Sequence, residues 1–354
     1  NEVKIDAAEQ MFAALTSVAK SGWMSFLQVQ PHISFEIVAT TGDISFYVSV
    51  PRDLRDLLEK QIYGAYPGAD ITEVDEYNIF TETGSVAFAS LRLKHASYMP
   101  MRSFRELPTD PLSSITSSLS KMQAGEGAAV QVLISPAGGK WKKQGQSFIS
   151  HIKKQESDPE KAKFAYDPKT LEAISNKSMR PGFKTVVRIV VSSTSAETAK
   201  MHLTNLTSSF TQFTSDQNSF TKVKHLIKRL FMIDFIYRYF PIVDIPTFQQ
   251  TSTLSSEELA TIFHFPNKSV ETPHIKWLNA KRAPASSRLP SAGLFVGNSR
   301  YRGISRPVYI GRDDRRRHIY SIGKTGVGKS ELLSSLILQD IQNGEGVCFI
   351  DPHD

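Results

Sequence analysis

The residues with the clearest chemistry lie in a glycine-rich segment near the end of this 354-residue chain. The segment consists of Gly323, Lys324, Thr325, Gly326, Val327, Gly328, Lys329 and Ser330, and it fits the pattern G-x-x-x-x-G-K-S of a phosphate-binding loop. Glycines adopt backbone angles closed to other residues, so successive N–H groups can point inward at phosphate oxygens. We therefore predict a site for a nucleoside triphosphate, ATP with Mg²⁺.

Each polar side chain of this segment has an expected role. Lys329 is expected to reach the β- and γ-phosphates, and the Ser330 hydroxyl is expected to ligate Mg²⁺. Glu331 follows in the first turn of the next helix and is included in the predicted cofactor-binding set. The alternative is a chance glycine-rich turn, which the flanking elements make less attractive.

A carboxylate downstream is the predicted catalytic residue. The run 346–351 is almost continuously apolar and ends at Asp351, as in a parallel strand buried on both faces. Asp351 would then lie at the carboxyl edge of the sheet, where ligands bind in such folds. It follows Lys329 by only 22 positions, which favours a separate site residue over a Walker B carboxylate. A strand-end aspartate that caps a turn with Pro352 remains a third interpretation.

The elements around the loop must hold it in place. We predict a short apolar strand over 317–322, then the loop, then a helix over 329–342 that Gly344 ends. The partial positive charge at the start of that helix would favour bound phosphate. Two short strands, 293–296 and 307–310, are expected to lead into this fold.

The preceding residues indicate α+β domains, each a sheet with helices on one face. We expect helices at 6–20, from Pro51, from Asp110, and at 141–155 and 196–213. Strands are expected at 32–40, 43–50, 71–77, 85–94, 128–135 and 186–191, with a turn at 41–42 and a polar loop over 158–180. The spacing of Ser255 and Glu258 predicts a capping box.

These elements divide the chain into four expected parts. They are an α+β domain over 1–100, a second over 101–250, a linker with a short helix over 251–290, and the N-terminal part of an α/β P-loop ATPase domain over 291–354. We expect the chain to be a piece of a longer protein, with this last domain truncated.

The net charge and the composition limit which kinds of partner the chain can have. The net charge is +7 and the pI about 9.3, which permits nucleic acid or an anionic membrane as a partner. The single cysteine, Cys348, excludes a disulfide framework within the chain. The most apolar stretch, 230–245, is too short and too charged to span a bilayer.

Three groups of basic residues, and also His264, each allow a functional and a structural interpretation, and those of the first basic group hold for the second as well. Lysines around Trp141 and Phe148 could bind single-stranded nucleic acid, although a charged outer helix face is favoured. Arginines before the loop could contact a polyanion or a neighbouring subunit's nucleotide, or form a solvated edge with Asp313 and Asp314. His264 is expected to be packed rather than a metal ligand. The basic groups are Lys140, Lys142, Lys143, Lys153 and Lys154, then Lys222, Lys224, Lys228 and Arg229, then Arg312, Arg315, Arg316 and Arg317.

Four segments together resemble the HerA/FtsK-like motor ATPases. These are Asp313–Tyr320, Gly323–Leu333, Asp340–Ile341 and Gly344–Asp354. Within that superfamily they look most like bacterial type IV secretion and conjugative DNA-transfer ATPases, which carry an Asp-Pro-His-Gly-Asp or Asp-Pro-Lys-Gly-Glu signature. Here His353 is followed directly by Asp354, so the glycine is missing.

The resemblance implies a homo-hexameric motor at the inner face of the plasma membrane, with secretion-channel proteins as partners. It implies ATP hydrolysis coupled to translocation of single- or double-stranded DNA or of protein, with the Walker B pair and arginine finger beyond Asp354. Two other functions remain as alternatives. One is a docking scaffold whose nucleotide site regulates assembly without turnover, and the other is a chromosomal or repair DNA translocase of the same superfamily.

Overall fold

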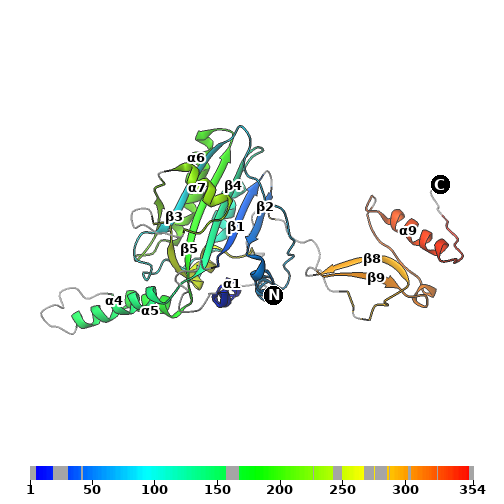
Figure 1. The fold of residues 1–354 in the computed structure, drawn as a ribbon, viewed down its shortest axis with the longest axis horizontal. Helices are drawn as coiled ribbons and strands as arrows, with labels where there is room; N and C mark the ends of the chain where they lie inside the picture. The colour runs from blue at the N-terminus through cyan, green and yellow to red at the C-terminus, as the bar shows by residue number, and fades with distance from the viewer. Residues whose placement is uncertain are drawn as a thin grey trace. The chain divides into compact units, whose positions relative to one another are not determined.

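The computed structural model describes residues 5–18, 31–40, 43–156, 167–225, 227–241, 249–266, 275, 285–286, 288–301, 304–324 and 326–350. The chain forms two compact units (Figure 1). The sheet unit comprises Asn1–Ala69 and Asp75–Trp277, and the loop unit comprises Asp70–Val74 and Leu278–Asp354. Each is described by itself.

A seven-stranded antiparallel sheet forms the centre of the sheet unit (Figure 1). The strand order is β2-β1-β4-β5-β3-β6, and β7 pairs with the start of β5. The strands are β1 Ile33–Thr40, β2 Asp43–Ser49, β3 Ser85–Leu93, β4 Gly127–Pro136, β5 Gly182–Ser193, β6 Phe220–Val223 and β7 Ser252–Ser255. Strands from the two expected domains, 1–100 and 101–250, therefore interleave in one sheet, and a boundary near residue 100 does not divide it.

The helices of the sheet unit follow the expected apolar periodicities in most places. They are α1 Ile5–Ala14, α2 Arg55–Ala65, α3 Leu112–Leu119, α4 Lys140–Glu156, α5 Pro168–Met179, α6 Ala196–Ser208, α7 Lys228–Ile236 and α8 Ser256–Ile262. Short 3₁₀ turns adjoin α1, α2 and α6, at Leu15–Val18, Arg52–Leu54 and Ser209–Phe213, and another stands alone at Phe104–Glu106. The predicted capping box at Ser255 and Glu258 is confirmed at the start of α8.

Helices cover both faces of the sheet, whereas the sequence predicted helices on one face. Phe35 packs against Phe12 of α1 and against Phe263 just after α8. On the opposite face, Phe231 and Phe235 of α7 join a buried cluster with strand residues. Because β1, β4 and β5 are covered on both sides, their side chains are buried almost without interruption.

Two predictions of local structure, at 71–77 and within the polar loop over 158–180, are wrong. No strand forms at 71–77, where several acidic side chains face solvent and the backbone pairs with no neighbour in the described residues. Residues 168–179 of the expected polar loop form α5 instead. Asp167 caps that helix, Pro168 starts it, and Leu171, Ile174 and Lys177 form its buried stripe. The expected turn at 41–42 lies outside the described residues, although the register of β1 with β2 is that of a hairpin.

The loop unit contains one hairpin and one long helix among its described residues. The hairpin pairs β8 Leu294–Tyr301 with β9 Ile304–Ile310, and the helix is α9 Lys329–Gln342. A 3₁₀ turn at Asp314–Arg316 lies between them in sequence. The two short strands predicted at 293–296 and 307–310 form as parts of the longer strands β8 and β9, and the predicted bounds of α9 are confirmed.

The two strands predicted to flank the loop are absent from the described residues. Residues 317–322 and 346–350 are irregular, and Tyr320, Ile322 and Ile350 are each more than four-fifths exposed. A buried parallel strand needs neighbouring strands, and the described sheet of this unit is a two-stranded hairpin. Asp351, together with Pro352, His353 and Asp354, lies outside the described residues.

Candidate functional site

The candidate nucleotide site is the loop that leads into α9. Gly326 and Gly328 have φ angles of 82° and 89°, in the left-handed region that only glycine adopts without strain. Gly328 is the N-cap of α9. Two glycines in this conformation so close together turn the chain sharply into the helix, which is the arrangement that presents backbone N–H groups to an anion.

Lys329 is held by the loop itself. Its Nζ donates to the carbonyl oxygens of Gly323 and Lys324, at 2.8 Å each. The side chain thus folds back over the start of the loop rather than extending along the helix. A Cβ built on Gly323 would come within 2.7 Å of Val327 Cγ2 and 3.3 Å of Lys329 Cγ, so the backbone approach here depends on glycine.

The remaining predicted cofactor residues face solvent where they are described. Ser330 and Glu331 are exposed in the first turn of α9, and Lys324 and Val327 are exposed in the loop. Thr325 lies outside the described residues. The site is therefore accessible from solvent, as binding of a soluble nucleotide requires.

A pair of hydrogen bonds anchors α9 to the hairpin. Phe295 N donates to Gln339 Oε1 at 2.9 Å, and Gln339 Nε2 donates to Phe295 O at 3.0 Å. The amide side chain thus takes the place of a neighbouring strand at β8. At the far end of α9, Gly344 N donates to Ile341 O and Glu345 N to Asp340 O, which is a Schellman ending with Gly344 at φ 76°.

The arginines before the loop take different partners from those expected. Arg315 forms an ion pair with Asp340 of α9. Arg312 lies 2.9 Å from Glu345. These pairs join the segment before the loop to the end of α9, rather than pairing with Asp313 and Asp314.

A second polar group, which the sequence analysis missed, is buried in the sheet unit. Glu36, Gln131 and Arg188 are opposite one another on β1, β4 and β5 and are each fully buried. Arg188 donates to Gln131, and Gln131 donates to Glu36. Burial lowers the pKa of Arg188 to about 10, and the negative charges of Asp234 and Glu36 offset part of this decrease.

The end of α7 completes this buried row. Arg188 donates to the carbonyl oxygens of Asp234 and Tyr239, at 2.9 and 2.7 Å. Arg238, which has a φ of 56°, forms an ion pair with Glu36 at 2.8 Å. A cation at the end of a helix satisfies carbonyls that lack intrahelical partners. This buried row therefore fixes the end of α7 on the sheet.

Another cluster contains a serine, a histidine and a carboxylate, the residue types of a hydrolase triad, but their hydrogen bonds connect them in a different spatial order. Ser193 Oγ donates to Glu126 Oε1 at 2.6 Å, and His202 Nε2 lies 3.3 Å from Glu126 Oε2. Nucleophilic catalysis needs the imidazole beside the hydroxyl, with the carboxylate behind it. Here the carboxylate is in the middle, so the cluster is structural.

His264 is packed, as expected. Its Nδ1 lies 2.8 Å from Ala260 O and its Nε2 lies 3.1 Å from Asp110. Among the described residues, no group of three His, Cys, Asp or Glu side chains could hold a metal ion. Mg²⁺ at the loop would therefore depend on the Ser330 hydroxyl together with phosphate and water oxygens, which is a donor set that this ion accepts.

The fold defines a mixed α+β protein with an antiparallel sheet. The chain belongs to a family described as a domain of unknown function (DUF8128), whose model matches residues 1–278. The match covers the sheet unit and ends before the glycine-rich loop. No curated protein matches the chain. Within the described part, no helix combines the length and apolar character needed to cross a membrane.

Proposed function

We propose that the chain binds ATP with Mg²⁺ at the loop 323–330. The observation that carries the proposal is the combination at one helix start of Gly326 and Gly328 in left-handed conformations with Lys329 folded over the loop. The backbone N–H groups of the loop and the Lys329 ammonium would bind the phosphates. Mg²⁺, held by Ser330, would neutralise phosphate charge when bound.

The proposed role of this site is in a motor subunit of a type IV secretion or conjugation-like system, coupling ATP hydrolysis to translocation of DNA or protein. The support is the resemblance of residues 313–354 to those ATPases. We propose a homo-hexamer at the inner face of the plasma membrane, with secretion-channel proteins as partners.

A docking scaffold, whose nucleotide site regulates assembly without turnover, is the second candidate. Asp340 and Glu345 form ion pairs with arginines, so these two carboxylates stabilise the loop unit itself. Asp351, the predicted catalytic residue, lies outside the described residues.

Magnesium-dependent binding tests the nucleotide proposal. A fluorescent ATP analogue should bind the wild-type chain more tightly with Mg²⁺ than with EDTA. Ser330→Ala should abolish most of that difference while leaving the metal-free affinity intact, because only the metal ligand is removed. Equal Mg²⁺ dependence in the two proteins would contradict the assignment of Ser330.

Turnover then separates the two functions. A motor predicts that ATPase activity rises when DNA or a translocated protein is added. The scaffold predicts nucleotide binding without such stimulation, with an effect of ATP on the oligomeric state instead.

A further inference from the structure

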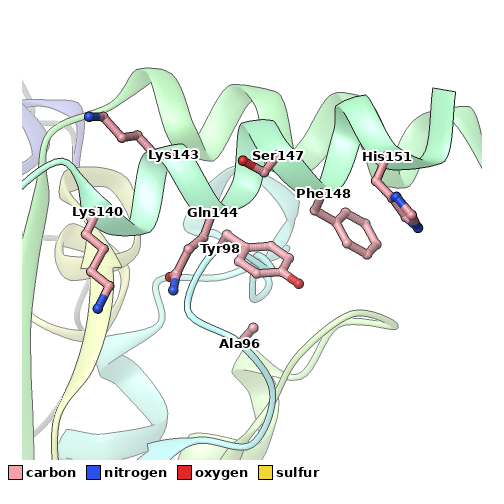
Figure 2. Close-up of a pocket in the computed structure, with 8 residues that line it drawn as sticks. All are labelled: Ala96, Tyr98, Lys140, Lys143, Gln144, Ser147, Phe148 and His151. Carbon is pink, nitrogen blue, oxygen red and sulfur yellow. The ribbon is translucent and has the colours of Figure 1, made fainter. Parts of the chain in front are cut away.

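A shallow groove runs along α4 in the sheet unit, far in sequence from the nucleotide loop. Its volume is about 700 Å³. We define the α4 groove by Tyr98, Lys140, Lys143, Gln144, Phe148 and His151, which line it together with small residues (Figure 2). A second hollow continues along the same helix past Ser150 to Lys154. The two hollows share Lys143 and His151, so they form one continuous surface.

The groove is strongly basic. The helix α4 contains five lysines and one histidine, and Glu156 at its end is its one acidic residue. Lys140, Lys143, His151 and Lys154 recur at helical spacing along the lined side, over about 21 Å of helix at 1.5 Å per residue. A row of lysines of this length suits a linear polyanion better than a single phosphate group.

An aromatic pair lies beside these cations. The rings of Tyr98 and Phe148 have centroids 5.3 Å apart and are tilted by 33°. Both side chains are half-buried, so part of each remains accessible to solvent. Figure 2 shows the two rings on the same side of α4 as Lys140 and Gln144. Supported aromatic rings between cations are the features on which unpaired bases stack.

The groove is built rigidly. The loop that carries Tyr98 is fixed by Asn218, which is buried and donates to the carbonyl oxygens of Ala96 and Met99. The buried Lys177 also donates to Met99 O. On α4, a Cβ at Gly145 would lie 3.1 Å from Tyr98 Cβ, so the glycine allows the loop to approach the helix closely. The aromatic pair is therefore held in place before any ligand arrives.

We propose that the α4 groove binds single-stranded nucleic acid, with phosphates on Lys140, Lys143 and Lys154 and bases stacked on Tyr98 and Phe148. The groove favours this partner over an anionic membrane because its exposed side chains between the lysines are polar, including Gln144, Ser147 and Ser150. A membrane-binding helix would present large apolar side chains there. The inference does not rest on the nucleotide site.

Fluorescence anisotropy with labelled DNA and RNA oligomers of ~20 nucleotides tests the proposal. Lys143→Gln/Lys154→Gln should bind about tenfold more weakly than wild type. The slope of log K against log salt concentration should also become shallower by about 1.4. Each lost phosphate contact on a single strand accounts for about 0.7 of that slope, and the variant loses two. Comparing DNA with RNA shows which of the two strands the groove prefers.

Phe148→Leu tests the stacking part separately. Leucine keeps apolar packing against Tyr98 but offers no aromatic face, so single-strand affinity should fall about tenfold with an unchanged salt slope. Binding to a duplex of the same sequence should change little, because paired bases cannot stack on the groove. Circular dichroism of each variant confirms that the fold is intact.

Matched controls make the outcome decisive. Lys121→Gln/Lys200→Gln removes the same charge from exposed positions outside the groove and should leave affinity within about twofold of wild type. Lys329→Ala should also leave it unchanged. The proposal is overturned if the groove and control variants bind alike, if wild type does not bind either strand, or if the groove variants lose only binding to phosphatidylserine vesicles.

Discussion

The sheet unit buries several charged residues, whereas the loop unit leaves most of its charged residues accessible. In the sheet unit, Glu36, Arg188, Lys177 and Glu258 are almost completely buried, and every one has a hydrogen-bonding partner. In the loop unit, Asp340 is the one buried residue of α9. Lys329 and Ser330 remain accessible at the start of that helix.

This difference separates residues that hold the fold from residues available to a ligand. Buried charges are costly unless they are paired, so those of the sheet unit are committed to their neighbours. The exposed polar groups at the loop lose little by exchanging solvent for phosphate. We therefore expect substitutions of buried charges to change stability, and substitutions at the loop to change binding with little effect on stability.

The largest effect is expected at the buried ion pair of Lys177 and Glu258, whose charged atoms are 2.9 Å apart. Glu258 accepts from the backbone N–H groups of Met101 and Ser255. Glu258→Gln keeps an acceptor oxygen for one of them and leaves the Lys177 ammonium uncompensated in the interior. Unfolding in urea should show a loss of about 3–5 kcal/mol. Lys177→Met combined with Glu258→Gln should recover part of that loss, because the unpaired charge is gone.

An exposed pair is the matched control. Lys60 and Asp56 on α2 are 3.2 Å apart but mostly exposed. Asp56→Asn should cost less than about 0.5 kcal/mol. If the two substitutions lowered the free energy of unfolding by similar amounts, the proposed difference between buried and accessible charges would be contradicted.

The next effect is a pH dependence of the sheet unit. Burial, and then the charge of Arg188, lowers the pKa of His225 from 6.5 to about 4. The unfolded chain therefore binds a proton at higher pH than the folded one. The stabilisation is complete above pH 6.5 and is lost as the pH falls towards 4. Burial lowers the pKa of His32 in the same direction.

Because the His225 ring is only half-buried, we expect its contribution to be about 1–2 kcal/mol after screening by solvent. His225→Phe preserves the ring contacts with Phe88 and Phe231 and removes the titration. Urea unfolding from pH 7.5 to 4.5 should have a shallower pH slope in this variant. An unchanged slope would show that the half-buried ring is not coupled to folding.

The smallest effect should be local to the loop unit. Gln339→Ala removes both hydrogen bonds to Phe295, which should lower the opening free energy of α9 by about 1 kcal/mol. Hydrogen exchange of the α9 amides should accelerate about fivefold, with no change in β4 or β5. Gln342→Ala, at the exposed end of α9, is the control and should leave exchange unaltered.

Local signals in the sequence predicted much of this structure. The capping box at Ser255, the Gly344 helix end and the apolar periodicities placed α8, α9 and the β1–β2 hairpin, because each depends on neighbours in sequence. The Glu36–Gln131–Arg188 row could not be predicted, since it depends on the register of strands whose paired residues are 95 and 57 positions apart in the sequence. In the sequence, Glu36 alternates with the apolar residues of β1, and a glutamate that faces solvent would show the same alternation.

Two other failures have specific physical causes. The stripe of Leu171, Ile174 and Lys177 in α5 is hidden because its third member is a lysine that is buried through an ion pair. The apolar run 346–350 has the composition of a buried strand, but composition does not supply neighbouring strands. At the candidate site, the glycine conformations followed from the motif, whereas the anchoring of α9 by Gln339 had no sequence signature.

The most direct test of the central claim is ATP binding by Lys329→Ala, compared with Lys324→Ala in the same loop. Lys324 is exposed, and its predicted role is through the backbone, so Lys324→Ala should bind ATP nearly as well as wild type. Lys329→Ala removes the ammonium that would bind the phosphates, and affinity measured by titration calorimetry should fall by about 2 kcal/mol or more. Equal affinity of the Lys329→Ala variant and wild type would contradict the assignment of this loop as a nucleotide site.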